Sequence, residues 1–147
     1  MSEKNGNGKR NTFLNYASMV ILVAALAFLI LIMVWLFYPY KIAHFTTFEV
    51  TNRQVKQGDS IHLSIVMDKY KSLPADYVYA IEDGALYNIL SGRTFKAAGH
   101  YELDRNFVIP KDASPGTYHL VLVNTYHPNP LRQIDIKTTS NEFEVVK

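Results

Sequence analysis

Hydrophobic residues fall into two regimes along this chain. From Ala17 to Tyr38 there are 22 consecutive residues without a charge, whereas beyond Pro39 apolar and polar residues alternate in short runs. A helix of this length extends about 33 Å, enough to cross a hydrocarbon core of about 30 Å. The first regime therefore predicts one transmembrane helix, and the second predicts a domain built from strands.

Aromatic residues mark both ends of the apolar segment. Phe13 and Tyr16 precede it, and Trp35 and Tyr38 lie at its other end. Such belts form where ring bodies are apolar and their polar tips reach water. We therefore assign residues 13–40 to a transmembrane helix and its exit.

The flanking charges predict an orientation. Residues 1–12 are rich in Asn, Gly and Lys and are predicted to form a disordered tail. This tail carries three basic residues, whereas the first 15 residues beyond the span carry Lys41 and Arg53. The excess of positive charge favours a cytoplasmic N-terminus and an extracytoplasmic C-terminal domain, periplasmic or at the cell surface.

Beyond the span, runs rich in β-branched and aromatic residues predict strands. Ile61, Leu63 and Ile65 alternate with their neighbours, which is the period of a half-buried strand. Asp83-Gly84 is a hairpin signal, and Ser91-Gly92 is a predicted break. The predicted strands are residues 44–51, 61–66, 77–82, 85–90, 101–109, 117–126 and 132–138, with a last short run around Phe143 and Val145.

About seven short strands without an amphipathic helix predict an all-β domain, an antiparallel β-sandwich over residues 41–147. One stretch adds detail: a strand ends at Pro110, a corner runs to Gly116, and Tyr118 begins the next strand. This resembles the E–F corner of immunoglobulin-like domains, in which a tyrosine hydrogen-bonds back to the loop. The chain has no cysteine, and its one tryptophan lies in the apolar segment, so the resemblance is to disulfide-free members of this class.

The overall layout carries a second resemblance. The chain combines one span, the exit Tyr38-Pro39-Tyr40-Lys41, a sandwich and a proline-containing loop at residues 126–132. This layout is similar to that of small membrane proteins of phage and small-genome bacteria. The resemblance implies no particular activity.

Immunoglobulin topology would bring two loops to the membrane side of the domain. One of them contains two prolines, an apolar tip and an arginine that can bind a carboxylate or phosphate. The interaction hypothesis therefore names residues of both loops: His127, Pro128, Asn129, Pro130, Leu131 and Arg132, with Lys69, Tyr70 and Lys71. The alternative is purely structural, with Leu131 folded onto the core and Arg132 paired with Asp135.

Composition argues against several classes of function. The net charge of +2 comes from the first 40 residues, because residues 41–147 carry 12 basic and 12 acidic side chains. This balance gives nucleic-acid binding no electrostatic support. The five histidines lack metal-ligand spacing, and no known catalytic motif is present, so we expect no enzyme, no metal and no cofactor.

The sequence thus predicts a binding function of unspecified target. The first hypothesis is a membrane-anchored protein-interaction module, for example an accessory subunit of a membrane complex, with the bilayer and a membrane or periplasmic protein as partners. The alternative is a structural or virion-associated membrane protein of a phage. A metal carrier or an enzyme is a third and weaker hypothesis, and the oligomeric state stays open.

Overall fold

The computed structural model describes residues 6–147, with side chains from residue 15 onward. These residues form one helix and eight strands. The elements are α1 (Gly6–Phe37), β1 (Ala43–Val50), β2 (Gln54–Lys56), β3 (Ser60–Lys69), β4 (Pro74–Glu82), β5 (Leu86–Phe95), β6 (Gly99–Val108), β7 (Gly116–Asn129) and β8 (Arg132–Val146). The chain divides after Pro39 into two compact units, and the β domain is Tyr40–Lys147.

Helix α1 is long and apolar enough to cross a membrane. Its segment Asn15–Phe37 has 23 residues and a mean hydropathy of 3.2, and its side chains are not buried by protein. The helix begins at Gly6, several residues before the predicted start, so residues 6–12 are helical rather than part of a disordered tail. Residues 1–5 of the predicted tail lie outside the described residues.

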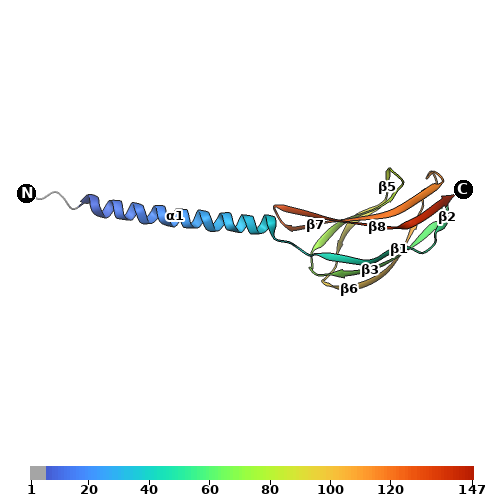
Figure 1. The fold of residues 1–147 in the computed structure, drawn as a ribbon, viewed down its shortest axis with the longest axis horizontal. Helices are drawn as coiled ribbons and strands as arrows, with labels where there is room; N and C mark the ends of the chain where they lie inside the picture. Colours follow the sequence, from blue (N-terminus) through green and yellow to red (C-terminus); the bar gives the residue numbers. More distant parts are fainter. Residues whose placement is uncertain (1–5) are drawn as a thin grey trace, which may run out of the picture. The chain divides into compact units, whose positions relative to one another are not determined.

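The β domain is the predicted β-sandwich. One sheet has the order β1-β3-β6, the other has the order β2-β8-β7-β4-β5, and the two sheets face each other (Figure 1). The orders β1-β3-β6 and β8-β7-β4 match strands A-B-E and G-F-C of the immunoglobulin fold. The prediction of fold class is therefore confirmed, with eight strands in place of about seven.

The core lies between the sheets and follows the alternation in the sequence. In β3 every second residue is buried, including Ile61, Leu63 and Ile65. Side chains of β7 and β8 face them from the other sheet, among them Leu120 and Phe143. Packing of these two inner faces stabilises a domain that has no disulfide.

Three details of the strands differ from the sequence prediction. Strand β5 runs through Ser91-Gly92 to Phe95, because Gly92 leaves room for a tyrosine of β4: a Cβ there would lie 2.8 Å from the hydroxyl of Tyr77. Strand β8 is continuous, and its pairing with β7 shifts register near Leu120. Strand β2, which pairs in parallel with β8, was not predicted because three residues are too few to show a period.

The sandwich is closed along one side and open along the other. On the closed side, the amide of Asn141 in β8 bonds to both backbone groups of Val50 in β1, at 2.7 and 3.0 Å. On the open side, β5 and β6 are the edge strands of different sheets and do not pair with each other. Residues 96–98 connect them at one end.

The two ends of the domain are defined by strand register. The end that holds Tyr40, here called the Tyr40 end, also holds the pairing of Ala43 with Lys69 and the β7–β8 turn at Pro130-Leu131. The opposite end, here called the corner end, holds the loop 110–116 between β6 and β7.

Candidate functional site

The two predicted interaction loops lie together at the Tyr40 end. The guanidinium of Arg132 lies 5.6 Å from the ring centroid of Tyr40, and the ammonium of Lys41 lies 4.6 Å from that of Tyr70. Beneath them is a small apolar cluster, separate from the main core, built from Ile42, Ala75 and Tyr126 with Tyr40, Leu73, Ile134 and Ile136 packed against it. The structure therefore brings residues 69–71 and 127–132 to the same end of the domain.

The alternative interpretation of residues 127–132, a purely structural loop with Leu131 folded onto the core, is wrong about Leu131. Leu131 is 53% exposed and is not folded onto the core. The carboxylate of Asp135 accepts hydrogen bonds from Thr125 and Gln133. The amide oxygen of Asn129 accepts one from the backbone N–H of Leu131 at 3.0 Å, which shapes the turn.

At the corner end, Tyr118 makes the hydrogen bond that the corner resemblance predicts. Its hydroxyl donates to the carbonyl oxygen of Ser114 at 2.7 Å. Burial raises the pKa of the Tyr118 phenol, and the Asp83 carboxylate raises it further, so the phenol keeps its proton. Pro110 and Gly116 delimit the corner that this bond stabilises.

Replacing Tyr118 by phenylalanine should therefore lower the free energy of unfolding of the β domain by about 1 kcal/mol, the net value of one hydrogen bond. Urea unfolding of the full chain in detergent micelles, followed by near-UV circular dichroism, measures the change. Tyr70→Phe, at an exposed tyrosine, is the matched control and should leave the midpoint in place. An unshifted midpoint for Tyr118→Phe would show that the corner bond does not stabilise the domain.

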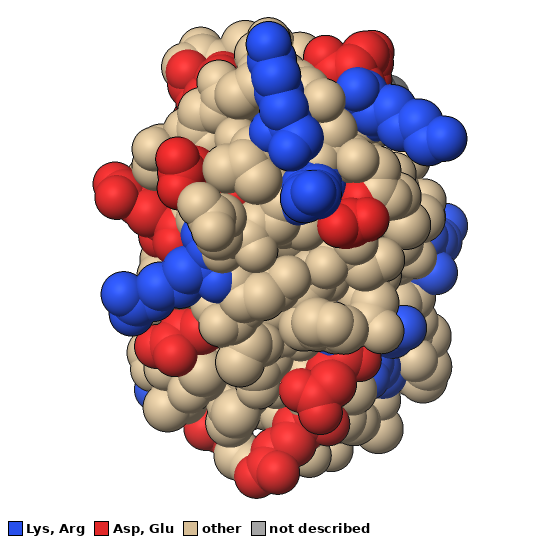
Figure 2. Space-filling model, turned by 90° about the vertical axis from the view of Figure 1, so that its right-hand side faces the viewer, with Lys and Arg blue, Asp and Glu red and all other residues tan. Residues whose placement is uncertain are grey.

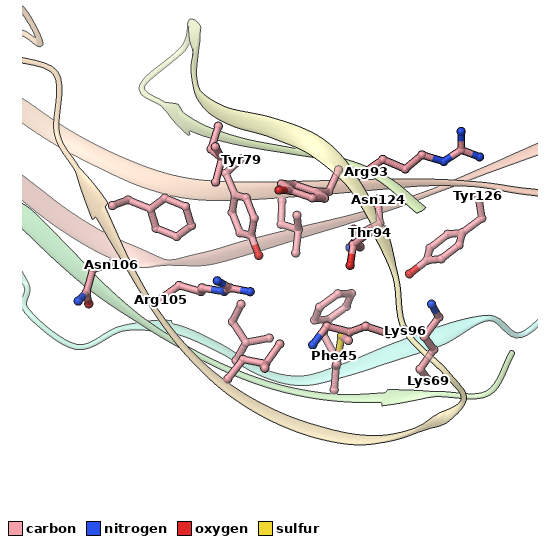
Figure 3. Close-up of a pocket in the computed structure, with 17 residues that line it drawn as sticks. Phe45, Lys69, Tyr79, Arg93, Thr94, Lys96, Arg105, Asn106, Asn124 and Tyr126 are labelled. Atoms are coloured by element: carbon pink, nitrogen blue, oxygen red, sulfur yellow. The ribbon is translucent and has the colours of Figure 1, made fainter. Parts of the chain in front are cut away.

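A cavity of about 250 Å³ opens between the sheets on their unpaired side. No pattern in the sequence predicts this cavity. Its wall comes from both sheets: β1, β3 and β6 on one side, and β4, β5 and β7 on the other (Figure 3). Its inner wall includes the buried core side chains Ile65, Met67 and Leu122, together with the buried polar residues Lys69 and Asn124.

The charged residues around the cavity are all basic: Lys69, Arg93, Lys96 and Arg105. Within the part of the chain whose side chains are described, Arg93 is the one of the four that forms an ion pair, since its Nε lies 3.6 Å from Asp76. Figure 3 shows Arg105 extending from β6 toward Tyr79 on the opposite sheet. The cavity is therefore lined by apolar and polar side chains in similar measure, and its charged residues are all basic.

Neighbouring positive charges oppose the protonation of two of these residues, Lys69 and Lys96. Burial lowers the pKa of Lys69, and the charge of Lys96 lowers it further. Burial likewise lowers the pKa of Lys96, and Arg105 adds to the effect. Lys69 donates to the carbonyl of Leu73 at 2.7 Å, and Lys96 lies 4.5 Å from the ring centroid of Tyr101. Neither neighbour cancels the positive charge.

Strand β5 presents a second surface that sequence analysis did not single out. Seven large apolar side chains of the β domain are exposed, and four of them belong to β5: Leu86, Tyr87, Leu90 and Phe95. The strand pairs with β4 on one side and has no strand on its other side among the described residues. By contrast, the corner end seen in Figure 2 carries basic and acidic side chains intermixed over an otherwise uncharged surface.

The histidines are dispersed. In the sheet β1-β3-β6, His100 lies between Asp68 and Glu102, and His62 contacts Asn106. In the other sheet, His119 of β7 contacts the carbonyl of Ser140. Among the residues that the structure describes, no group of three or more His, Asp or Glu side chains could hold a metal ion.

Comparison with known proteins identifies no family. No protein-family model and no curated protein matches the chain. No match supports the predicted resemblance to small membrane proteins of phage and small-genome bacteria.

Comparison with solved structures gives matches of low identity and low TM-score. The sporulation control protein Spo0M from Bacillus subtilis is 12% identical over 72% of this chain and 50% of its own, with a TM-score of 0.49. A Niemann-Pick type C2 protein from the Japanese carpenter ant is 8% identical over 74% of this chain and 96% of its own, at 0.47. The ASH/PapD-like domain of human CEP192 is 12% identical over 70% of this chain and 87% of its own, with a TM-score of 0.37. At these sequence identities and TM-scores, the structural similarities support no conclusion about function.

Proposed function

We propose that this protein is a membrane-anchored protein-interaction module, without catalytic activity, whose β domain binds an extended segment of a partner protein along β5. The observation that carries the proposal is the free edge of residues 90–95. Strand addition to such an edge gives affinity through backbone hydrogen bonds and specificity through alternate side chains.

The other edges of the two sheets are less suitable for a partner strand. Strand β2 has three residues, and β1 is tied to β8 through Asn141. The exposed side chains of β6 include His100, Glu102 and Asp104, and charges of this kind protect edges in natural proteins. Strand β5 is ten residues long, and its single charged side chain is Arg93.

Within β5, the stretch from Leu90 to Phe95 is the most accessible to a partner. A register shift against β4 separates Asn88 from Leu90, and such bulges twist an edge away from neighbours. From Leu90 onward the pairing with β4 is regular for six residues. Ser91 and Gly92 are small, so the backbone of a partner can approach closely there.

The anchor and the orientation complete the proposal. The apolar helix holds the domain at a bilayer, and the basic residues before it favour an extracytoplasmic domain. The partner is then a membrane or periplasmic protein that presents an extended, apolar segment. The surface of residues 127–132 at the Tyr40 end, with exposed Leu131, is the competing contact site within the same function.

Photocrosslinking in the native membrane tests the proposal. Probes are placed one at a time at Phe95 on β5, at Leu131 in the Tyr40-end loop and at Val108, an exposed apolar residue of β6. We expect a discrete adduct with another protein at Phe95 and none at Val108. Adding Ser91→Lys should reduce the Phe95 adduct several-fold, because a charge on the edge opposes strand addition. Thr139→Lys, at an exposed position of β8, adds the same single positive charge and is the control.

Three outcomes would overturn the assignment to β5. An adduct only at Leu131 would place the contact at the Tyr40 end, and an adduct with a second copy of the chain would exclude a separate partner. Retention of the Phe95 adduct in the Ser91→Lys variant would show that β5 does not carry the binding.

A further inference from the structure

The inter-sheet cavity supports an inference that does not depend on the β5 edge. Its mouth lies between the two edge strands of the open side, and its inner wall is made by core side chains of β3 and β7. A molecule in this cavity would contact an apolar interior and a charged margin at once. Few ligand classes satisfy both surroundings.

The apolar part of the wall is continuous with the main core. Ile65, Met67 and Leu122 are buried, and Phe45 and Leu103 pack against the same cluster. Empty space beside such side chains forfeits their dispersion contacts, and an apolar group that fills it restores them. This wall therefore favours a hydrocarbon chain over a polar molecule.

The charged margin requires the opposite chemistry. Lys69, Lys96 and Arg105 come from β3, the β5–β6 connection and β6, and their charges oppose one another. No described carboxylate forms an ion pair with any of the three. An anion among them would relieve the repulsion and accept charge-assisted hydrogen bonds.

Asn124 of β7 adds an independent observation. Its side chain lines the cavity, and the residue is only 7% exposed. Within residues 15–147 its amide makes no hydrogen bond to another protein group. Among the described residues no buried side-chain nitrogen or oxygen atom lacks a hydrogen-bond partner, so the amide of Asn124 is accessible from the open cavity. A ligand atom in the cavity can therefore hydrogen-bond to it.

We propose that the inter-sheet cavity binds an amphiphile with one anionic headgroup and a single short hydrocarbon chain. Lys96 and Arg105 hold the headgroup, which is a carboxylate or a phosphate, while the chain lies against Ile65, Met67 and Leu122. The amide of Asn124 bonds to a headgroup oxygen.

The size of the cavity limits the ligand. Its volume of about 250 Å³ lies just below the range of about 300–1,000 Å³ that is usual for small-molecule pockets. One short chain fits this space, whereas a phospholipid with two long chains does not. A membrane-anchored domain meets single-chain amphiphiles at the surface of the bilayer.

Photolabelling of the full chain in phosphatidylcholine nanodiscs tests this inference. The probe is decanoate with a diazirine on its chain, and the matched neutral probe is decanol with the same group. We expect decanoate to label cavity residues such as Met67 and Leu122 saturably, and decanol to label them at least about tenfold less. Decanoate and decyl phosphate should compete for the label, whereas methyl decanoate and inorganic phosphate should not.

Two variants separate the site from general charge effects. Arg105→Gln with Lys96→Gln should weaken decanoate binding at least about tenfold, as expected when a charge-assisted hydrogen bond is lost. Arg53→Gln with Lys56→Gln removes the same charge outside the cavity and should leave binding unchanged. Leu103→Trp, which fills the cavity from an edge strand, should also abolish labelling, with near-UV circular dichroism reporting that the fold is kept.

The inference would be overturned by equal labelling with decanol, by labelling confined to α1, or by full labelling of the Arg105→Gln, Lys96→Gln variant. Effective competition by inorganic phosphate would also overturn it, because the site would then need no chain. The edge of β5 and the cavity share Leu90, Arg93 and Thr94, but Phe95 does not line the cavity. Crosslinking to a protein at Phe95 and decanoate labelling at Met67 and Leu122 are therefore scored separately.

Discussion

Replacing Phe143 by alanine should destabilise the β domain by about 3–5 kcal/mol, the usual cost of removing a buried phenylalanine. Phe143 is 1% exposed and lies opposite Tyr118 in the β7–β8 ladder, with ring centroids 6.2 Å apart in a stacked arrangement. Its loss would leave a cavity beneath the corner, where Tyr118 holds Ser114. The substitution therefore removes apolar contacts and also weakens the support of the tyrosine corner.

Urea unfolding of the full chain in detergent micelles measures this loss, with near-UV circular dichroism as the signal for the β domain. Phe95→Ala is the matched control, because it deletes the same atoms from a side chain that is 68% exposed. We expect the control to shift the free energy of unfolding by less than about 0.5 kcal/mol. Equal effects of the two substitutions would show that Phe143 is not part of the core.

Replacing Asn141 by alanine should cost about 2–3 kcal/mol, although it deletes only a few atoms. The side chain accepts a hydrogen bond from the N–H of Val50 at 2.7 Å and donates to its carbonyl at 3.0 Å. Val50 is buried, so both of its backbone groups would lose their partners away from water. Each unsatisfied buried group costs about 1–3 kcal/mol.

The same unfolding assay tests this expectation, with Asn88→Ala on exposed β5 as the control. Hydrogen exchange gives a second measure, because the amide of Val50 should lose protection before the rest of β1. If Asn141→Ala matched the control, water would have replaced the amide at Val50, and the closed side of the sandwich would not depend on this residue.

The sequence predicts the parts of this fold that depend on local patterns. A 22-residue uncharged segment has no stable alternative to a helix in a bilayer. The alternation at Ile61, Leu63 and Ile65 fixes which face of β3 is buried, and Tyr118 is recognisable because the corner before it is local. These features need only a few consecutive residues to be read.

The cavity could not be predicted, because no local pattern contains it. Lys69, Lys96 and Arg105 lie on three different segments of the chain, and each resembles an ordinary solvated charge. They converge only because the chain crosses between sheets at residues 96–98, so that β5 and β6 form a gap instead of a ladder. Asn124, in an otherwise apolar run of β7, was the one available signal.

The β5 edge was missed for a different reason. Ser91-Gly92 indicates a break by composition, and a break at that point shortens the strand and hides its free edge. Gly92 instead serves the packing of Tyr77, a contact that depends on the neighbouring strand. Similarly, the prediction that residues 69–71 and 127–132 lie at the same end of the domain came from the assumed immunoglobulin topology. The sequences of the two loops do not indicate it by themselves.

The direction of β1 determines how the domain responds to mechanical load. The strand begins at the Tyr40 end, runs toward the corner end and pairs with β3 along its length, from Ala43 opposite Lys69 to Val50 opposite Leu63. A pull on residue 40 against a load held at the corner end acts along β1. The backbone hydrogen bonds between β1 and β3 are then loaded together in shear instead of breaking one after another. The β domain therefore resists tension applied between its Tyr40 end and its corner end.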